Sequence, residues 1–87
     1  MKIKYQKRFQ KNYQKRILPY TNLNQQFKSR FKLFLKNPSH PFLKDHKLAG
    51  KLKEYRTFSI SGDIRLVYKR LNDSLLLYDI GAHNQVY

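Results

Sequence analysis

The sequence contains no cysteine and no tryptophan. The absence of cysteine excludes a disulfide framework, a cysteine-ligated zinc site and a thiol nucleophile. Only three glycines are present, and none belongs to a glycine-rich phosphate-binding loop. No apolar run approaches the ~20 residues of a membrane span, and no apolar segment follows the basic N-terminus, so we expect neither a membrane segment nor a signal peptide. At 87 residues the chain is expected to form a single intracellular domain with one small core.

Acidic residues are also scarce, with five Asp and Glu against nineteen Lys and Arg, which gives a formal net charge of +14. Residues 1–36 contain eleven basic residues and no acidic one. A solvated lysine-rich surface is the ordinary explanation of such a run, but uninterrupted like charges repel one another across a small domain. We therefore predict a polyanionic partner, either a nucleic acid or an acidic protein.

The first half of the chain has the apolar pattern of two helices. After an alternating segment at 2–5, which is typical of a short strand, an apolar residue recurs at every fourth position from Tyr5 to Ile17. Pro19 is expected to end this helix, and Thr21 or Asn22 to cap the next one. The second helix should end before residues 37–38, and the aromatic residues are predicted to form core rather than a base-stacking surface. Its predicted apolar face consists of Leu23, Phe27, Phe31, Phe34 and Leu35.

The second half has the pattern of three strands. A loop with two prolines at 37–45 precedes alternating or apolar segments at 55–60, 64–70 and 74–80, and two turns separate these segments. Gly81 is predicted to end the last strand and to leave a short polar tail. We thus predict an α+β fold of order β-α-α-β-β-β over residues 1–87. Both helices should pack on one face of an antiparallel sheet, because each has one apolar stripe, and the open face should hold the site.

Acid–base groups and cations lie near the ends of the predicted strands. His46 follows the loop, Asp63 and Arg65 begin the middle strand, and His83 and Tyr87 follow the last strand. Imidazole transfers protons near neutral pH, and arginine stabilises charge on a phosphate. Metal-free RNA cleavage needs a base for the 2′-hydroxyl, an acid for the leaving 5′-oxygen and such a cation. The histidines lack carboxylate partners at ligand spacing, so we predict no metal site.

Each of these residues, taken singly, also has a structural explanation. Asp63 follows a Ser-Gly pair and suits a turn, and Arg65 can pair with Asp79 across the sheet. His83 can be an ordinary tail residue, and the ring of Tyr87 can simply pack.

Three elements in the second half carry a resemblance to a known family. They are H-x-L-x-G-x-x-x-x-Y-R at 46–56, G-D-x-R-L-V-Y at 62–68 and D-I-G-x-H-x-x-x-Y at 79–87. In this order and spacing they resemble the RelE/ParE superfamily of bacterial toxins, and most closely its YafQ-type branch. The first half is similar in element order, length and basic character.

The resemblance implies a compact RelE-like domain acting as the toxin of a type II toxin–antitoxin system. It implies a cofactor-free endoribonuclease that enters the ribosomal A site and cuts mRNA by attack of the ribose 2′-oxygen, which inhibits translation. The implied partners are a cognate antitoxin, ribosomal RNA and mRNA, together with operator DNA through the antitoxin complex. The implied location is the bacterial cytoplasm.

The resemblance also implies roles for individual residues. His83 is the first candidate for proton transfer, Asp63 and His46 are second acid–base or positioning groups, Arg65 contacts the scissile phosphate and Tyr87 stacks on a nucleotide. The expected RNA-binding residues are Lys51, Lys53, Tyr55 and Arg56.

Three positions depart from the YafQ-type pattern. Ser59 stands where a histidine is common, Ile64 stands where tryptophan is common, and no arginine lies between residues 74 and 87. Arg65, Arg56 or Lys53 would then supply the missing cation. Two other functions are compatible with the same fold, namely a ParE-like toxin directed at DNA gyrase and a non-catalytic nucleic-acid-binding relative.

Overall fold

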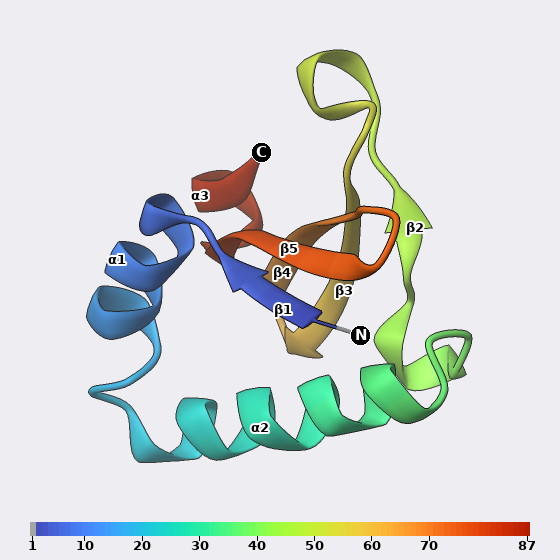
Figure 1. The fold of residues 1–87 in the computed structure, drawn as a ribbon. Coiled ribbons are helices and arrows are strands. Elements are labelled where there is room, and N and C mark those ends of the chain that lie inside the picture. Colours follow the sequence, from blue (N-terminus) through green and yellow to red (C-terminus); the bar gives the residue numbers. More distant parts are fainter. Residues whose placement is uncertain (1) are drawn as a thin grey trace.

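A computed structural model describes residues 2–87 and contains a five-stranded sheet in the order β1-β5-β4-β3-β2 (Figure 1). Strands β3, β4 and β5 form the predicted antiparallel meander, while β1 pairs in parallel with β5, so the sheet is mixed. The predicted α+β class and the predicted succession of a strand, two helices and a meander are confirmed, but β2 and α3 are additional elements and the sheet is not purely antiparallel. The elements are β1 (Lys2–Tyr5), α1 (Lys7–Arg16), α2 (Thr21–Lys36), β2 (His46–Lys47), β3 (Arg56–Ser61), β4 (Ile64–Arg70), β5 (Ser74–Ala82) and α3 (His83–Val86), with 3-10 turns at Pro41–Leu43 and Gly50–Leu52.

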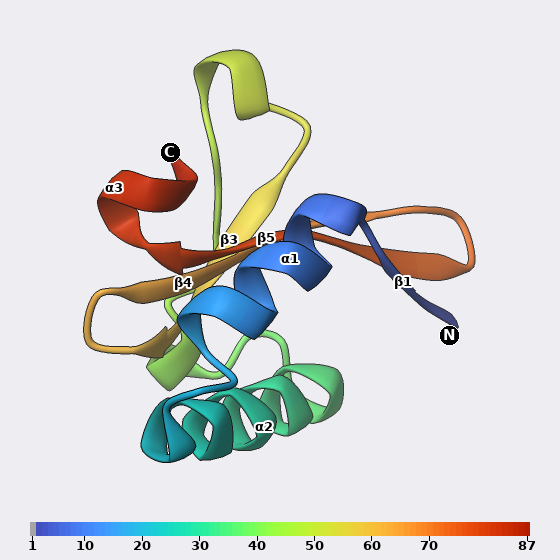
Figure 2. The same cartoon turned by 90° about the vertical axis from the view of Figure 1, so that its left-hand side faces the viewer.

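Helix α2 lies beneath the sheet, α1 lies at one end of it, and the short α3 lies on the opposite side from α2 (Figures 1 and 2). Phe34 of α2 stacks on Phe58 with ring centroids 4.5 Å apart and meets Tyr68 edge-on at 4.8 Å. Phe9 of α1 and Phe34 are buried, as the predicted aromatic core requires. Leu35 is 49% exposed, so its assignment to the core was wrong: it lies one residue past Phe34 and therefore about 100° around the helix.

Helix α2 begins one residue earlier than a cap at Thr21 would allow. Thr21 is already helical, the N-cap is Tyr20, and no side chain caps this end. The predicted caps are therefore wrong. The first turn is instead tied to α1, since the Tyr13 hydroxyl donates a hydrogen bond to Asn24.

Strand β5 continues through Gly81 to Ala82, contrary to the prediction that Gly81 ends it. A Cβ at Gly81 would lie 2.6 Å from Nη1 of Arg16. The glycine therefore permits close approach of α1 to the strand and does not terminate it. The residues after it form α3 rather than an extended tail.

Residues 48–55 join β2 to β3 and project beyond the sheet as an arm (Figure 1). The arm is closed at its base by a hydrogen bond from the Leu48 amide to the Tyr55 carbonyl, at 3.0 Å. No helix within residues 2–87 has the length and apolar character needed to span a bilayer.

Candidate functional site

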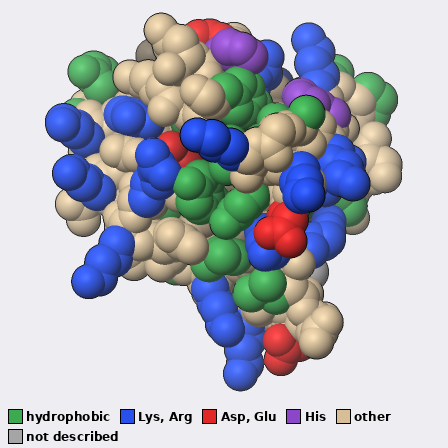
Figure 3. Space-filling model, turned by 90° about the horizontal axis from the view of Figure 1, so that it is seen from above, with side chains coloured by type: hydrophobic (Ala, Val, Ile, Leu, Met, Phe, Trp, Pro, Cys, Tyr) green, Lys and Arg blue, Asp and Glu red, His purple; other side chains and the backbone are tan. Residues whose placement is uncertain are grey.

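The sheet face turned away from α2 is the open face predicted from the helix stripes. Seen from this side, lysine and arginine side chains surround a group of hydrophobic side chains, and histidine side chains are also visible (Figure 3). Helix α3 covers one end of the face, packed on β5 and β4.

Helix α3 brings the end of the chain back to the β3–β4 turn. The His83 amide donates to the Asp63 carbonyl at 3.1 Å. The Ala82 amide donates to Oε1 of Gln85 at 2.7 Å, which closes the start of the helix. Asp63, in the β3–β4 turn, and His83, just after β5, are thereby adjacent, although they are 20 residues apart in the sequence.

Tyr87 is fixed at its hydroxyl and exposed at its ring. The hydroxyl donates to Oγ1 of Thr57 at 2.8 Å, and Thr57 in turn donates to the Leu66 carbonyl at 3.0 Å. The Tyr87 ring meets the His83 ring edge-on, with centroids 4.5 Å apart. Because Tyr87 remains 42% exposed, its ring can contact a ligand while its hydroxyl stays anchored.

Arg65 lies on the same sheet face, between Ser59 of β3 and Gly81 of β5 in the register. Within residues 2–87, no hydrogen bond or ion pair engages the Arg65 guanidinium, and the side chain is half-buried. The expected alternative, a pair with Asp79, does not form. The guanidinium is therefore available to an anion.

His46 of β2 is paired in the register with Thr57, so the two side chains share a sheet face. Nδ1 of His46 lies 2.9 Å from the Lys44 carbonyl, which can only accept, so Nδ1 carries the proton. In the neutral imidazole, Nε2 then has a free lone pair. His46 is exposed and can act as a proton acceptor.

Arg56 is held by a carboxylate rather than free for RNA. Its Nε lies 2.7 Å from Oδ1 of Asp45, and the Tyr68 hydroxyl donates to the other oxygen of the same carboxylate. The hydrogen bond to Asp45 raises the pKa of Arg56. Burial, followed by the bond to Asp45, raises the pKa of Tyr68 well above its ordinary value.

Asp79 is buried and joins β5 to α1. Its Oδ1 accepts a hydrogen bond from Asn12 at 2.7 Å, and its Oδ2 lies 3.5 Å from Nε of Arg8. Arg16 lies 3.7 Å from Oδ1 and donates to the Ile80 carbonyl at 3.0 Å. Three consecutive turns of α1 thus contact one carboxylate, and this explains why Arg65 is left without it.

The arm adds two hollows beside the face. The larger, of about 490 Å³, carries four basic side chains and a single acidic one. The smaller, of about 310 Å³, lies between the arm and Tyr87 and includes Lys51. The larger hollow is lined by Lys47, Lys53, Glu54, Tyr55, Arg56 and Arg70.

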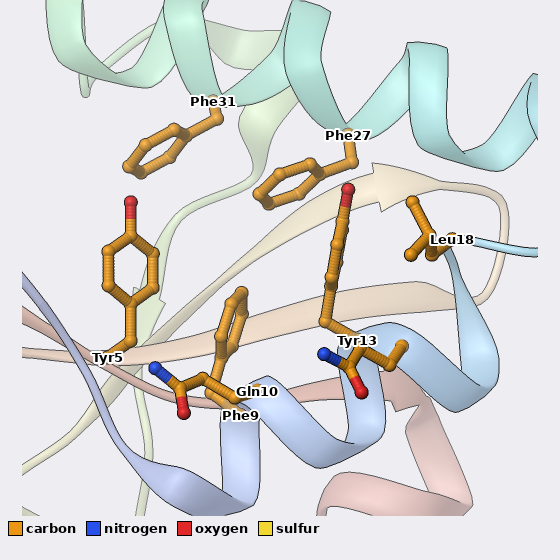
Figure 4. A pocket seen from close by; sticks show the side chains of 8 residues that line it. Tyr5, Phe9, Gln10, Tyr13, Leu18, Phe27 and Phe31 are labelled. Atoms are coloured by element: carbon orange, nitrogen blue, oxygen red, sulfur yellow. The ribbon is translucent and has the colours of Figure 1, made fainter.

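A third hollow, of about 570 Å³, lies between α1 and α2 on the other side of the molecule (Figure 4). Aromatic rings from both helices point into it, and Figure 4 shows Phe27 and Phe31 facing Tyr13 and Tyr5. It has no histidine, carboxylate or basic group among its lining residues, so it offers no acid–base chemistry. The lining residues are Tyr5, Phe9, Gln10, Tyr13, Gln14, Leu18, Phe27 and Phe31.

Sequence reasoning missed three residues of the open face that the structure places beside the predicted ones. Thr57 alternates with Tyr55 and Ser59 along β3, so period-2 alternation could have assigned it to this face. Arg8 and Tyr78 are 70 residues apart, yet Nη1 of Arg8 donates to the Tyr78 hydroxyl at 2.6 Å. No local sequence pattern predicts a contact between residues so far apart.

The five-stranded mixed sheet with α1 and α2 packed against it has the RelE-like fold, which is shared with YafQ from E. coli and with a YoeB/ParE toxin from Agrobacterium tumefaciens. The chain belongs to the family described as the bacterial toxin of type II toxin–antitoxin system, YafQ, whose model matches residues 1–87. The resemblance stated from the three motifs is thereby confirmed. The protein is a type II toxin.

Solved structures agree with this assignment. A copper-bound L66S mutant toxin from Helicobacter pylori shares 32% identity at a TM-score of 0.82, over 100% of this chain and 99% of that one. YafQ from E. coli strain BL21(DE3) shares 27% identity at a TM-score of 0.79, over 98% and 96%. YafQ in the E. coli DinJ–YafQ complex shares 27% identity at 0.75, over 98% and 96%. A search of curated protein sequences gave no match.

Residues 2–87 bring no three His, Cys, Asp or Glu side chains together as a metal site would.

Proposed function

We propose that this toxin is an endoribonuclease that cuts mRNA in the ribosomal A site without a metal ion and thereby inhibits translation. One observation carries the proposal. The fold of α3 sets His83 beside the Asp63 turn and the Tyr87 ring, on the sheet face that bears Arg65. Imidazole, carboxylate and guanidinium are the groups that transfer protons and stabilise charge in such a reaction.

In the proposed reaction a base removes the proton of a ribose 2′-hydroxyl, and the oxygen attacks the adjacent phosphorus. The bond from phosphorus to the 5′-oxygen breaks, and an acid gives that oxygen a proton. The products are a 2′,3′-cyclic phosphate and a 5′-hydroxyl.

We assign proton transfer to His83, whose exposed ring is held edge-on by Tyr87. His46, with Nε2 unprotonated in its neutral form, and Asp63 are the second acid–base groups. Arg65, free of protein partners within residues 2–87, holds the charge of the phosphate.

Tyr87 orients a nucleotide by stacking on its base. Lys51, Lys53 and Tyr55 bind RNA from the arm. Arg56 lines the same hollow as Lys53 and Tyr55, but its guanidinium is paired with the Asp45 carboxylate. We therefore assign Arg56 a structural role in the wall of the hollow and not a role as an independent phosphate ligand.

The proposed partners are ribosomal RNA, mRNA and a cognate acidic antitoxin, with operator DNA reached through the antitoxin complex in the bacterial cytoplasm. The net charge of +14, most of it in residues 1–36, supports polyanionic partners. The E. coli relative has been solved in complex with DinJ.

Primer extension on one mRNA in a reconstituted translation system tests the proposal, run with and without ribosomes. We expect cuts within the A-site codon only when ribosomes are present, and a loss of at least ~100-fold in cutting for His83→Ala. His40→Ala is the matched control, because His40 caps the 41–43 turn away from the open face.

Intact mRNA and undisturbed translation with the wild-type toxin would overturn the nuclease, and would favour a gyrase-directed or purely binding role. Cutting without ribosomes would retain the chemistry and overturn the A-site mechanism. Equal cutting by His83→Ala and His40→Ala would remove His83 from the reaction.

A further inference from the structure

We propose that Tyr55 and Tyr78 form a stacking subsite for an unpaired RNA base beside the cleaved nucleotide, and that Arg8 and Lys69 bind the phosphates that flank that base. The proposal rests on the proposed function in taking single-stranded RNA as the substrate.

The two rings meet from separate parts of the chain. Tyr55 ends the arm and Tyr78 lies in β5, and their ring centroids are 4.6 Å apart with an interplanar angle of 42°. Both side chains are only half-buried. Tyr55 precedes Thr57 by two residues, which is about 7 Å along a strand. Since Thr57 anchors Tyr87, the tyrosine pair directly adjoins the candidate cleavage site.

A basic side chain lies over each ring of the pair. The guanidinium carbon of Arg8 lies 5.2 Å from the Tyr78 ring centroid, and its Nη1 donates to the Tyr78 hydroxyl. Nζ of Lys69 lies 5.7 Å from the Tyr55 centroid and 3.5 Å from the exposed carboxylate of Glu54. Each ring therefore has a cation against it, and a base would stack on the part of the two rings that remains exposed.

The backbone and a buried acid set this arrangement. The β4–β5 register shifts between Val67 and Tyr68, which makes Tyr78 the extra residue of a β-bulge. Bulges redirect a side chain and often lie next to active sites. The next residue, Asp79, is 1% exposed and holds Nε of Arg8. Asn12 and Arg16 also join α1 to β5, and the Arg8 side chain remains 56% exposed, so a phosphate can reach its guanidinium although Asp79 and Tyr78 already contact it.

The composition of this surface suits RNA. Single-stranded RNA presents a π-face on each base and a phosphate at each linkage, and proteins bind it with aromatic rings next to Arg and Lys. The hollow of about 490 Å³ that includes Tyr55 adds Lys53 of the arm next to this surface.

The affinity for a fluorescently labelled single-stranded RNA octamer tests the subsite. The full chain carries His83→Ala so that binding is separated from cutting, and anisotropy is measured with Tyr78→Leu added. We expect a 5- to 150-fold weaker affinity, because base–aromatic stacking contributes ~1–3 kcal/mol per base. The matched control is Tyr20→Leu, since Tyr20 is 58% exposed on the α1–α2 connection. Tyr78→Phe keeps the ring and should stay within a few-fold of the parent.

The proposal fails if Tyr78→Leu binds the octamer like Tyr20→Leu. It also fails if the loss is equally large for an octamer of abasic nucleotides, because charge rather than stacking would then carry the affinity. Weaker binding to poly-L-glutamate with RNA affinity unchanged would assign the surface to an acidic protein instead.

Photocrosslinking of 5-iodouridine RNA to the unaltered chain does not depend on how a variant folds. An adduct on Tyr55 or Tyr78 is expected, and adducts confined to other residues would contradict the subsite. If the wild-type toxin bound the RNA but did not cut mRNA, the proposed nuclease activity would be contradicted, whereas the stacking subsite would not.

Discussion

Asp45 shows how single residues fix the neighbourhood of the site. Its carboxylate, 9% exposed, takes hydrogen bonds from Arg56 and from the buried hydroxyl of Tyr68. These bonds anchor the loop before β2 to the adjacent strands β3 and β4. Burial, and after it the bond to Asp45, raises the pKa of Tyr68 and keeps the phenol protonated.

Tyr68→Phe tests this arrangement through the pH dependence of stability. The pKa of Tyr68 is raised in the folded chain, so above pH ~10 the unfolded chain loses the proton first and the free energy of unfolding falls. Below that pH the group adds no slope. Between about pH 9 and pH 11 we expect the wild type to lose about 1 kcal/mol more than Tyr68→Phe. Urea unfolding across this range measures the difference, and parallel curves would contradict it.

The sequence predicted the positions of the candidate site residues better than their contacts. Asp63, Arg65, His83 and Tyr87 were expected at strand ends, and the structure places them on or beside one face. The engagement of Arg56 by Asp45 was not predictable, because a loop carboxylate has no periodic pattern that fixes its direction. The contact of Arg8 with Tyr78 was not predictable for a similar reason. Helical periodicity identifies the buried stripe of α1 but does not identify the residues that its polar side contacts.

Among the elements, α1, β5 and α3 meet at Gly81. A Cβ there would lie 2.6 Å from Nη1 of Arg16 and 2.8 Å from Oε1 of Gln85. Nη1 of Arg16 donates the hydrogen bond that joins α1 to the Ile80 carbonyl. Oε1 of Gln85 accepts the hydrogen bond from the Ala82 amide that closes the start of α3. The glycine is thus where the N-terminal helix and the helix that carries His83 are both attached to the sheet.

Gly81→Ala should therefore destabilise the fold more than an alanine at another glycine. We expect a loss of about 1–3 kcal/mol in the free energy of unfolding, because Arg16 and Gln85 must both give up hydrogen bonds worth about 0.5–1.5 kcal/mol each. Gly62→Ala is the matched control: its φ is +48° but nothing lies within 4 Å of its Cβ, so about 1 kcal/mol of backbone strain is expected. Urea unfolding compares the two, and equal losses would contradict the attachment.

The predicted elements were right where a pattern repeated and wrong at the ends. Period-4 and period-2 repeats located α1, α2 and the three-stranded meander. The caps of α2, the continuation of β5 through Gly81 and the formation of α3 depend on contacts between distant segments. Strand β2 has only two residues, too few for any alternation to show.

For the whole molecule, the folded chain concentrates an excess of positive charge on its surface. Only four of its nineteen basic side chains (Arg8, Arg16, Arg56 and Lys69) form ion pairs within residues 2–87. Asp45 and Asp79, two of its five acids, are turned inward. The remaining cations repel one another in the free toxin, and this repulsion is released when a polyanion binds.

Salt should consequently stabilise the free toxin. Raising NaCl from about 20 mM to about 300 mM shortens the Debye length below the ~10 Å reached at 0.1 M and screens the repulsion. We expect a gain of about 1 kcal/mol, which is a rise in Tm of roughly 5 °C for a domain of this size. A K11E/K28E double variant at two exposed helix positions is the control, because it lowers the net charge and should shrink the response. Circular dichroism melts measure both responses. A Tm that is unchanged or lower in salt would mean that the surface cations are already balanced by charges within the fold. The electrostatic argument for the proposed polyanionic partner would then fail.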